Sequence, residues 1–167
     1  GVRLPVILTA SDERILRYRH PLPQSMAIEH RLMLIVVAES WGLHVAHTQF
    51  RELGERGAEI DDRAAKLGEV LSAMRAATIP GNTLGDVLNA AREAYKTQGL
   101  EKEWTLHHQG GTIGYQAREH IATPDDLTPI KPGMAFAWNP SAAGFKLEET
   151  LYLDPSGAQH ILATTRD

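Results

Sequence analysis

The stretch from His107 to Glu119 reads HHQGGTIGYQARE and combines two adjacent histidines, three glycines and a charged pair. Its first two residues end an aromatic segment at 104–108, where we expect a strand, and the proline-rich connector TPDDLTPIKPG follows it. A phosphate-binding glycine loop would lead directly into a helix, whereas the pattern here predicts a strand. We therefore expect the glycines to serve the backbone and the polar side chains around them to carry any function.

Composition limits the classes of protein to which this stretch can belong. A chain of 167 residues with 43% hydrophobic residues can bury one good-sized core, which predicts a single domain over 1–167. The net charge is −4, and without a basic run we do not expect a nucleic-acid partner. The longest apolar run, 32–38, is too short to span a membrane. The absence of cysteine excludes disulfides and thiolate chemistry and fits the cytoplasmic location that we expect.

The pattern of apolar residues divides the chain into strands, then helices, then strands. Alternating or β-branched segments predict strands at 5–9, 32–38 and 42–50, the last two joined in a hairpin at 39–42. Apolar residues at helical spacing from Ile60 to Met74 predict a helix that ends at Pro80-Gly81. A second helix begins at Thr83, a good N-cap with Asp86 three residues later, and stops at Gly99.

The last third of the chain returns to strand patterns. We expect strands at 104–108, 134–138, 145–153 and 159–163. The order strands, helix pair, strands predicts an α+β domain in which the helices cover one face of a largely antiparallel sheet.

Four phrases occur in an order that resembles one known superfamily: IPGNTLGDVL, GGTIGYQARE, IKPGMAFAWNP and KLEETLYL. In this order and at this spacing they are similar to the "pita-bread" superfamily of creatinase, prolidase, aminopeptidase P and methionine aminopeptidase. The resemblance covers residues 20–167 and implies a curved, mostly antiparallel sheet with helices on one face. Family catalytic domains begin with a pair of helices for which this chain has no room. We therefore expect that an upstream segment is missing, consistent with Gly1 in place of Met, or that a homodimer covers the exposed sheet.

The resemblance also implies where a metal centre would lie. Active members of the superfamily hold two metal ions with two aspartates, one histidine and two glutamates. The corresponding positions here are Ile35, Ala46, Gly111, Asn139 and Glu148. A dinuclear site needs several carboxylates to balance and bridge its two ions, and Glu148 alone cannot provide them. We therefore expect no metal cofactor and no metal-dependent hydrolysis.

Polar residues nevertheless remain around the expected pocket. His20 and His107 resemble family histidines that contact substrate, and the family's His-Glu pair reads Arg118-Glu119 here. Arg118 could bind a carboxylate bidentately, while amide side chains offer both donors and acceptors. The resemblance implies a pocket for a small polar or carboxylate ligand that is formed by His20, His107, His108, Gln109, Arg118, Glu119, Asn139 and Glu148.

The sequence leaves three classes of function open. We favour a non-catalytic domain that binds a small ligand or mediates interactions. The alternative is a divergent hydrolase of the Xaa-Pro aminopeptidase or dipeptidase type, in which His20, His107 and Glu148 hold a single zinc or manganese ion or act by acid–base chemistry. The third class is a structural, dimer-forming domain in which these histidines are structural, Arg118 and Glu119 form a surface ion pair, and Asn139 is a turn residue.

Overall fold

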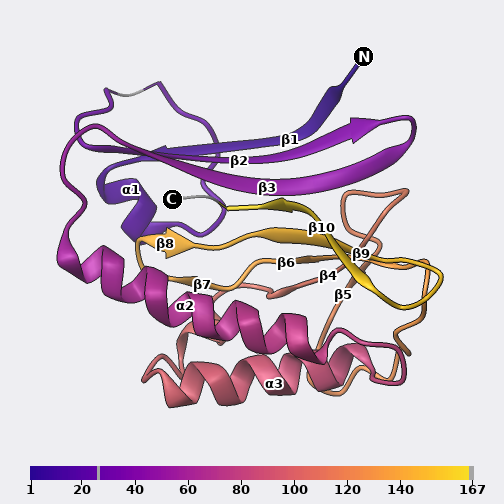
Figure 1. Ribbon diagram of the computed structural model, residues 1–167. Coiled ribbons are helices and arrows are strands. Elements are labelled where there is room, and N and C mark those ends of the chain that lie inside the picture. The colour runs from indigo at the N-terminus through magenta and orange to yellow at the C-terminus, as the bar shows by residue number, and fades with distance from the viewer. Residues whose placement is uncertain (26, 166–167) are drawn as a thin grey trace.

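The chain folds into antiparallel sheets that are covered on one side by two long helices (Figure 1). The computed structural model describes residues 1–25 and 27–165. Its strands are β1 (Arg3–Ser11), β2 (Arg31–Ser40), β3 (Leu43–Glu52), β4 (Gly110–Ile113), β5 (His120–Ile121), β6 (Ala135–Trp138), β7 (Ser141–Ala142), β8 (Phe145–Lys146), β9 (Glu149–Leu153) and β10 (Gln159–Thr164). Its helices are α1 (Glu13–Arg17), α2 (Ala58–Ala77), α3 (Leu84–Thr97) and the 3₁₀ helix η1 (Glu103–Thr105).

The strands form three antiparallel sheets. The first has the order β1-β2-β3, the second β10-β9-β6-β4-β5, and β7 pairs with β8. In Figure 1 the first sheet, the second sheet and the helices α2 and α3 lie in successive layers. The second sheet therefore has one face toward the helices and the other toward the β2-β3 hairpin.

Strand β6 shows how the middle layer is buried on both faces. Phe136 and Trp138 pack into the cluster that contains the helix residues, whereas Ala137 packs with Val37 and Ala46 of the hairpin. This alternation follows from the period of two along a strand. The site discussed below lies on the hairpin side and at the ends of these strands.

Both long helices are confirmed where periodicity predicted them. In α2 the buried residues Leu67, Val70, Leu71 and Met74 recur at helical spacing. In α3 the side chain of Thr83 accepts a hydrogen bond from the backbone of Asp86, whose carboxylate accepts one from Thr83 N, which completes a capping box. The predicted hairpin is also confirmed, with Trp41 and Gly42 both at positive φ in its turn.

Several details differ from the sequence prediction. The strand predicted at 104–108 is wrong: residues 103–105 form η1 and 106–109 are irregular. The amide Nε2 of Gln109 donates to the carbonyls of Trp104 and His107, which holds this segment as a compact turn. The segment 145–153 is divided into β8 and β9, and α1, which had not been predicted, lies between β1 and β2.

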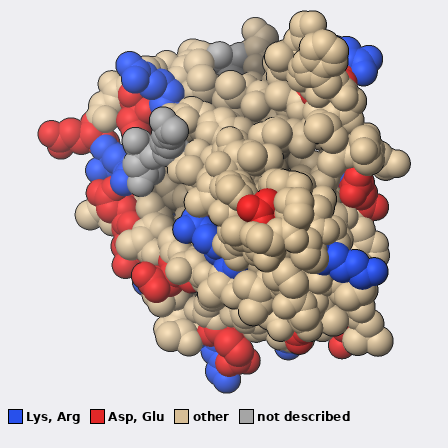
Figure 2. Space-filling model, turned by 45° about the vertical axis from the view of Figure 1, so that its right-hand side comes forward, with Lys and Arg blue, Asp and Glu red and all other residues tan. Residues whose placement is uncertain are grey.

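Charged side chains of both signs lie on the face of the molecule that Figure 2 shows. Figure 2 shows acidic and basic side chains scattered over the face in view, without a broad patch of one sign. Within the described residues no helix is long and apolar enough to cross a membrane.

Strand β1 and the residue before it expose the apolar side chains of Val2, Leu4 and Ile7. The homodimer expected from the sequence stays a prediction.

Candidate functional site

Ile35 and Ala46, which the resemblance places at the two aspartate positions of the superfamily, lie in the hydrophobic interior. Ala46 is fully buried in one apolar cluster with Val37, Ile113 and Ala137. Ile35 is buried in a neighbouring apolar cluster at the hairpin. The backbone of Ala46 is held by Thr150, whose hydroxyl accepts from Ala46 N at 3.0 Å and donates to Ala46 O at 2.9 Å. Both positions therefore carry apolar side chains where the family's carboxylate ligands would be expected. At Ala46 the backbone N–H and carbonyl groups are also satisfied by Thr150.

Gly111, which the resemblance places at the family's metal-binding histidine, is in a backbone geometry that excludes a side chain. A Cβ atom built on Gly111 would lie 1.9 Å from the carbonyl oxygen of His120 in the adjacent strand β5. Its neighbour Gly110 has φ of 115°, and a Cβ there would lie 2.1 Å from the carbonyl oxygen of Ala137. Strand β4 is thus fitted tightly between β5 and β6. This agrees with the expectation that these glycines are needed for the backbone conformation.

Glu148 is a buried carboxylate beside two buried cations. Its Oε2 accepts a hydrogen bond of 2.6 Å from Thr48 Oγ1 and lies 3.7 Å from Lys146 Nζ. Its Oε1 lies 3.9 Å from Arg118 Nη2. The side chains of Lys146 and Glu148 are each 3% exposed, and that of Arg118 is 18% exposed. Burial lowers the pKa of both Lys146 and Arg118 below their usual values, because it disfavours the charged forms.

Lys146 was not singled out in the sequence, although a signal was present. Lys146 and Glu148 are two residues apart in an extended segment, so their side chains share a face. The structure confirms this proximity, and Lys146 Nζ is buried without a hydrogen-bond partner. Thr48 was missed because nothing local in the sequence connects it to a residue 100 positions later.

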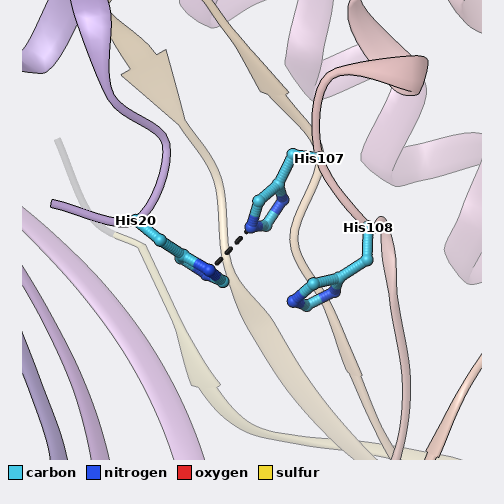
Figure 3. A group of neighbouring side chains, drawn as sticks. All are labelled: His20, His107 and His108. Atoms are coloured by element: carbon cyan, nitrogen blue, oxygen red, sulfur yellow. Dashed lines mark hydrogen bonds between the residues drawn. The ribbon is translucent and has the colours of Figure 1, made fainter.

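His20, His107 and His108 form a second group of polar side chains (Figure 3). His20 follows α1, while the other two precede β4. His107 Nε2 and His20 Nε2 are 2.8 Å apart and share a hydrogen bond. The ring centroids of His20 and His107 are 4.2 Å apart, and those of His107 and His108 are 4.3 Å apart. The three histidines named in the predicted pocket are therefore mutual neighbours.

The environment of the histidines favours their neutral forms. Burial, followed by the charge of Lys146, lowers the pKa of His107 to about 2. Burial, followed by the charge of Arg118, lowers the pKa of His108 to about 4. The pKa of His20 is lowered for the same first reason. Near neutral pH the three rings therefore present uncharged imidazoles to one another.

Two open hollows adjoin the histidines. One, of about 640 Å³, is lined by His20 and His107 together with residues of α1. The other, of about 450 Å³, is lined by His107 and His108 together with Trp104 and Pro124. Lys146 and Glu148 are more deeply buried and are not among the described residues that line either hollow. Solvent and small molecules can reach the histidine group directly.

The other residues of the predicted pocket are placed differently. Gln109 is buried and uses its amide in the interior: its Oε1 accepts from Tyr95 at 2.8 Å, and its Nε2 holds the preceding turn. Glu119 accepts a hydrogen bond from Tyr115 N and lines a separate hollow of about 500 Å³ with Leu43 and Met134. The side chain of Gln109 thus contacts the histidine segment at the backbone carbonyl of His107, whereas the hydrogen bond described for Glu119 lies within its own loop. Asn139 is buried, and both polar atoms of its side chain lack a partner.

The residues that the resemblance places at the five family positions do not fit a dinuclear metal centre. Two of the five positions are buried hydrocarbon, one is a glycine without room for a side chain, and one is a neutral amide. Glu148, the remaining carboxylate, is already opposed by two cations. Two divalent ions would add to this positive charge and would find too few anionic ligands to balance it.

The fold and the ordered motifs define a pita-bread domain of the prolidase and aminopeptidase P type. The model of metallopeptidase family M24 matches residues 5–160, and the chain therefore belongs to this family. No curated protein matches the sequence.

Solved structures share the fold at low sequence identity. A dipeptidase from Pyrococcus horikoshii is 21% identical with a TM-score of 0.82, and the match covers 96% of this chain and 46% of that one. An X-Pro aminopeptidase from Thermotoga maritima is 20% identical with a TM-score of 0.79, over 96% and 47% of the two chains. The N-terminal domain of FACT complex subunit SPT16 from Cicer arietinum is 14% identical with a TM-score of 0.79, over 96% and 42%. The chain thus spans about half the length of these proteins, and the likeness shows the fold alone.

Proposed function

We propose that this chain is a binding domain of the metallopeptidase family that takes a small carboxylate-bearing molecule and does not hold a dinuclear metal centre. The observation that carries the proposal is the presence of two buried cations, Lys146 and Arg118, beside a single carboxylate, Glu148. Amino acids and dipeptides are the class of ligand that we favour, because they carry a carboxylate and are small and polar.

The charge balance of this group favours an anionic ligand. Lys146 Nζ has no hydrogen-bond partner, and both contacts to Glu148 are longer than a hydrogen bond. With both cations charged, the group has one positive charge in excess, and a buried unpaired charge is costly. A second carboxylate beside Arg118 would remove this excess. Arg118 suits that role because its guanidinium can bind a carboxylate through two parallel hydrogen bonds.

Unpaired polar atoms near Arg118 offer further contacts to such a ligand. Arg118 Nη1 donates to the carbonyl of Ala137 at 3.3 Å, and Asn139 follows two residues later in the chain. The side-chain amide of Asn139 is buried with no partner for either of its polar atoms. An unsatisfied buried polar group costs roughly 1 to 3 kcal/mol, so a ligand that pairs with this amide would gain from both its donor and its acceptor.

Arg118→Lys is expected to weaken carboxylate binding although it keeps the charge, because lysine cannot form the bidentate pair. The measurement is a thermal-shift and calorimetric screen of amino acids, dipeptides and small carboxylates against protein kept in chelator. A ligand at about 100 times its dissociation constant should stabilise the wild-type fold by about 2.7 kcal/mol. Arg51→Lys, at an exposed position on β3, is the matched control and should bind as the wild type does. Equal affinity of Arg118→Lys and wild type for every hit, or the absence of any hit, would contradict the proposal.

Metal analysis tests the absence of a dinuclear centre. We expect fewer than two equivalents of manganese, cobalt, zinc or iron per chain after dialysis, because four of the five family positions lack a charged ligand. We also expect no hydrolysis of X-Pro or Met-X peptides, with or without added metal. The single-metal hydrolase is the alternative function, and metal-dependent turnover that is abolished in Glu148→Ala would decide in its favour.

A further inference from the structure

Three imidazole rings from two distant segments of the chain face a common space (Figure 3). One potential ligand nitrogen from each of His20, His107 and His108 lies within 4.8 Å of the other two. The described residues contain no second group of three or more His, Cys, Asp or Glu side chains that are as close together. None of the three histidines is at a position where the superfamily binds its metal ions.

The spacing of the nitrogens is close to that of ligands on one ion. Zinc–nitrogen bonds are about 2.0 to 2.1 Å, so two nitrogens on a tetrahedral ion are roughly 3.3 Å apart. The His20 and His107 Nε2 atoms are 2.8 Å apart, and one ligand nitrogen from each of the three rings lies within 4.8 Å of the other two. An ion would require the first pair to separate slightly and the third ring to approach. The exposed position of His20 leaves room for this adjustment.

Two buried ring nitrogens of the group have no hydrogen-bond partner. The three rings share one hydrogen bond, between His107 Nε2 and His20 Nε2. His107 Nδ1 and His108 Nδ1 are buried without any partner. When an ion binds both Nε2 atoms, the proton of the shared hydrogen bond moves to Nδ1 of its own ring, since a neutral imidazole binds metal through its unprotonated nitrogen.

We propose that His20, His107 and His108 together bind one divalent transition-metal ion of the zinc type, with three nitrogen ligands and an open fourth position. Nitrogen ligands favour zinc, cobalt, nickel and copper over magnesium, calcium and manganese. The two hollows that His107 lines give the ion and a fourth ligand access to the group.

The charges around the group define what that fourth ligand is. The charge of Lys146 acts on all three rings and that of Arg118 on His20 and His108, and Glu148 offsets only one of these two positive charges. A bound cation adds to the excess, so the fourth ligand is an anion: hydroxide or a carboxylate. This site goes beyond the carboxylate pocket proposed above, because the ion can bind whether or not that pocket takes a ligand.

The test titrates chelator-stripped protein with zinc alone in a buffer without carboxylates and follows binding by calorimetry. Wild type is expected to bind one equivalent, and cobalt in place of zinc should give the intense visible absorption of a four-coordinate site. His20→Gln and His108→Gln should each weaken zinc binding by at least about 100-fold. Loss of a residue that only hydrogen-bonds to a metal ligand already costs about 10- to 100-fold in affinity, and loss of the ligand itself should cost more. Unchanged unfolding of metal-free His20→Gln would show that the variant is folded.

His30→Gln is the matched control, because the side chain of His30 is 83% exposed and lies outside the group. It should bind zinc as wild type does. Less than one equivalent at saturation, or equal zinc affinity of His20→Gln and wild type, would overturn the site. Because the carboxylate screen is run in chelator and this titration without carboxylate, each proposal can fail while the other stands.

Discussion

Gly111→Ala is expected to lower the free energy of unfolding by about 3 to 5 kcal/mol, which is a large share of the stability of an ordinary domain. The added Cβ would lie 1.9 Å from the carbonyl oxygen of His120 and 3.0 Å from the backbone nitrogen of Ala122. These neighbours are backbone atoms of an adjacent strand, so they cannot rotate away as the end of a side chain could. The substitution therefore has to move β4 away from β5, at the cost of their hydrogen bonds.

Urea unfolding followed by circular dichroism measures this effect, and Gly68→Ala provides the control. Gly68 lies inside α2, where a Cβ would meet nothing within 4 Å. Alanine there should raise the free energy of unfolding by about 0.5 to 1 kcal/mol, because glycine is the poorer helix former. If Gly111→Ala were as stable as wild type, the tight fit of β4 against β5 would be wrong.

The tight fit at Gly111 also opposes the introduction of the family's metal-binding histidine at this position. A histidine at position 111 would need the same Cβ as alanine, so restoring that one ligand would displace β5 in this structure. The two aspartate positions would further require carboxylates in the apolar clusters of Ile35 and Ala46. The residues at these three positions are thus integrated into the packing, and single substitutions to the expected family ligands should not create a dinuclear centre.

The elements that the sequence predicted correctly are those whose signals are local. The spacing of apolar residues in α2, the cap formed by Thr83 and Asp86, and the hairpin turn at Trp41-Gly42 each act over a few residues. The strand predicted at 104–108 failed because its aromatic character reflects packing. Trp104 packs against the main core, with Arg92 over its ring at 4.9 Å, while Gln109 holds the turn.

The site was predictable only as far as family motifs and strand periodicity reach. The neighbourhood of His20, His107 and His108 followed from the resemblance, and the structure brings the three rings together. The side chain of Gln109 points into the interior, where it accepts a hydrogen bond from Tyr95. The residues next to Gln109 in the sequence give no sign of this contact. Glu119 was grouped with the pocket because it follows Arg118, yet in the structure its carboxylate closes its own loop at Tyr115.

Glu148→Gln is expected to lower the free energy of unfolding by about 3 kcal/mol or more. The change keeps the size of the side chain and an oxygen that can accept from Thr48, but it removes the negative charge opposite Lys146 and Arg118. Removing one partner of a buried ion pair leaves the other charge uncompensated, which typically costs 3 to 5 kcal/mol. Chemical denaturation near neutral pH in the absence of added carboxylates measures the loss.

A second variant separates the lost charge from any loss of packing. Lys146→Met combined with Glu148→Gln should recover more than half of the stability lost in Glu148→Gln, because the buried cation and its counter-ion are removed together. Glu13→Gln is the surface control: Glu13 pairs with Arg17 at 2.7 Å but its side chain is 78% exposed, and its loss should change stability by less than about 0.5 kcal/mol.

The outcome for Glu148 bears on function as well as on stability. If the single variant is strongly destabilised and the double variant recovers, Lys146 carries a charge in the folded protein that requires an anion. The excess of positive charge beside Arg118 then gives a physical reason for a carboxylate ligand to bind there. If Glu148→Gln instead unfolds at the same denaturant concentration as wild type, Lys146 is held without its charge. The argument for an anionic ligand would then lose the observation on which it rests.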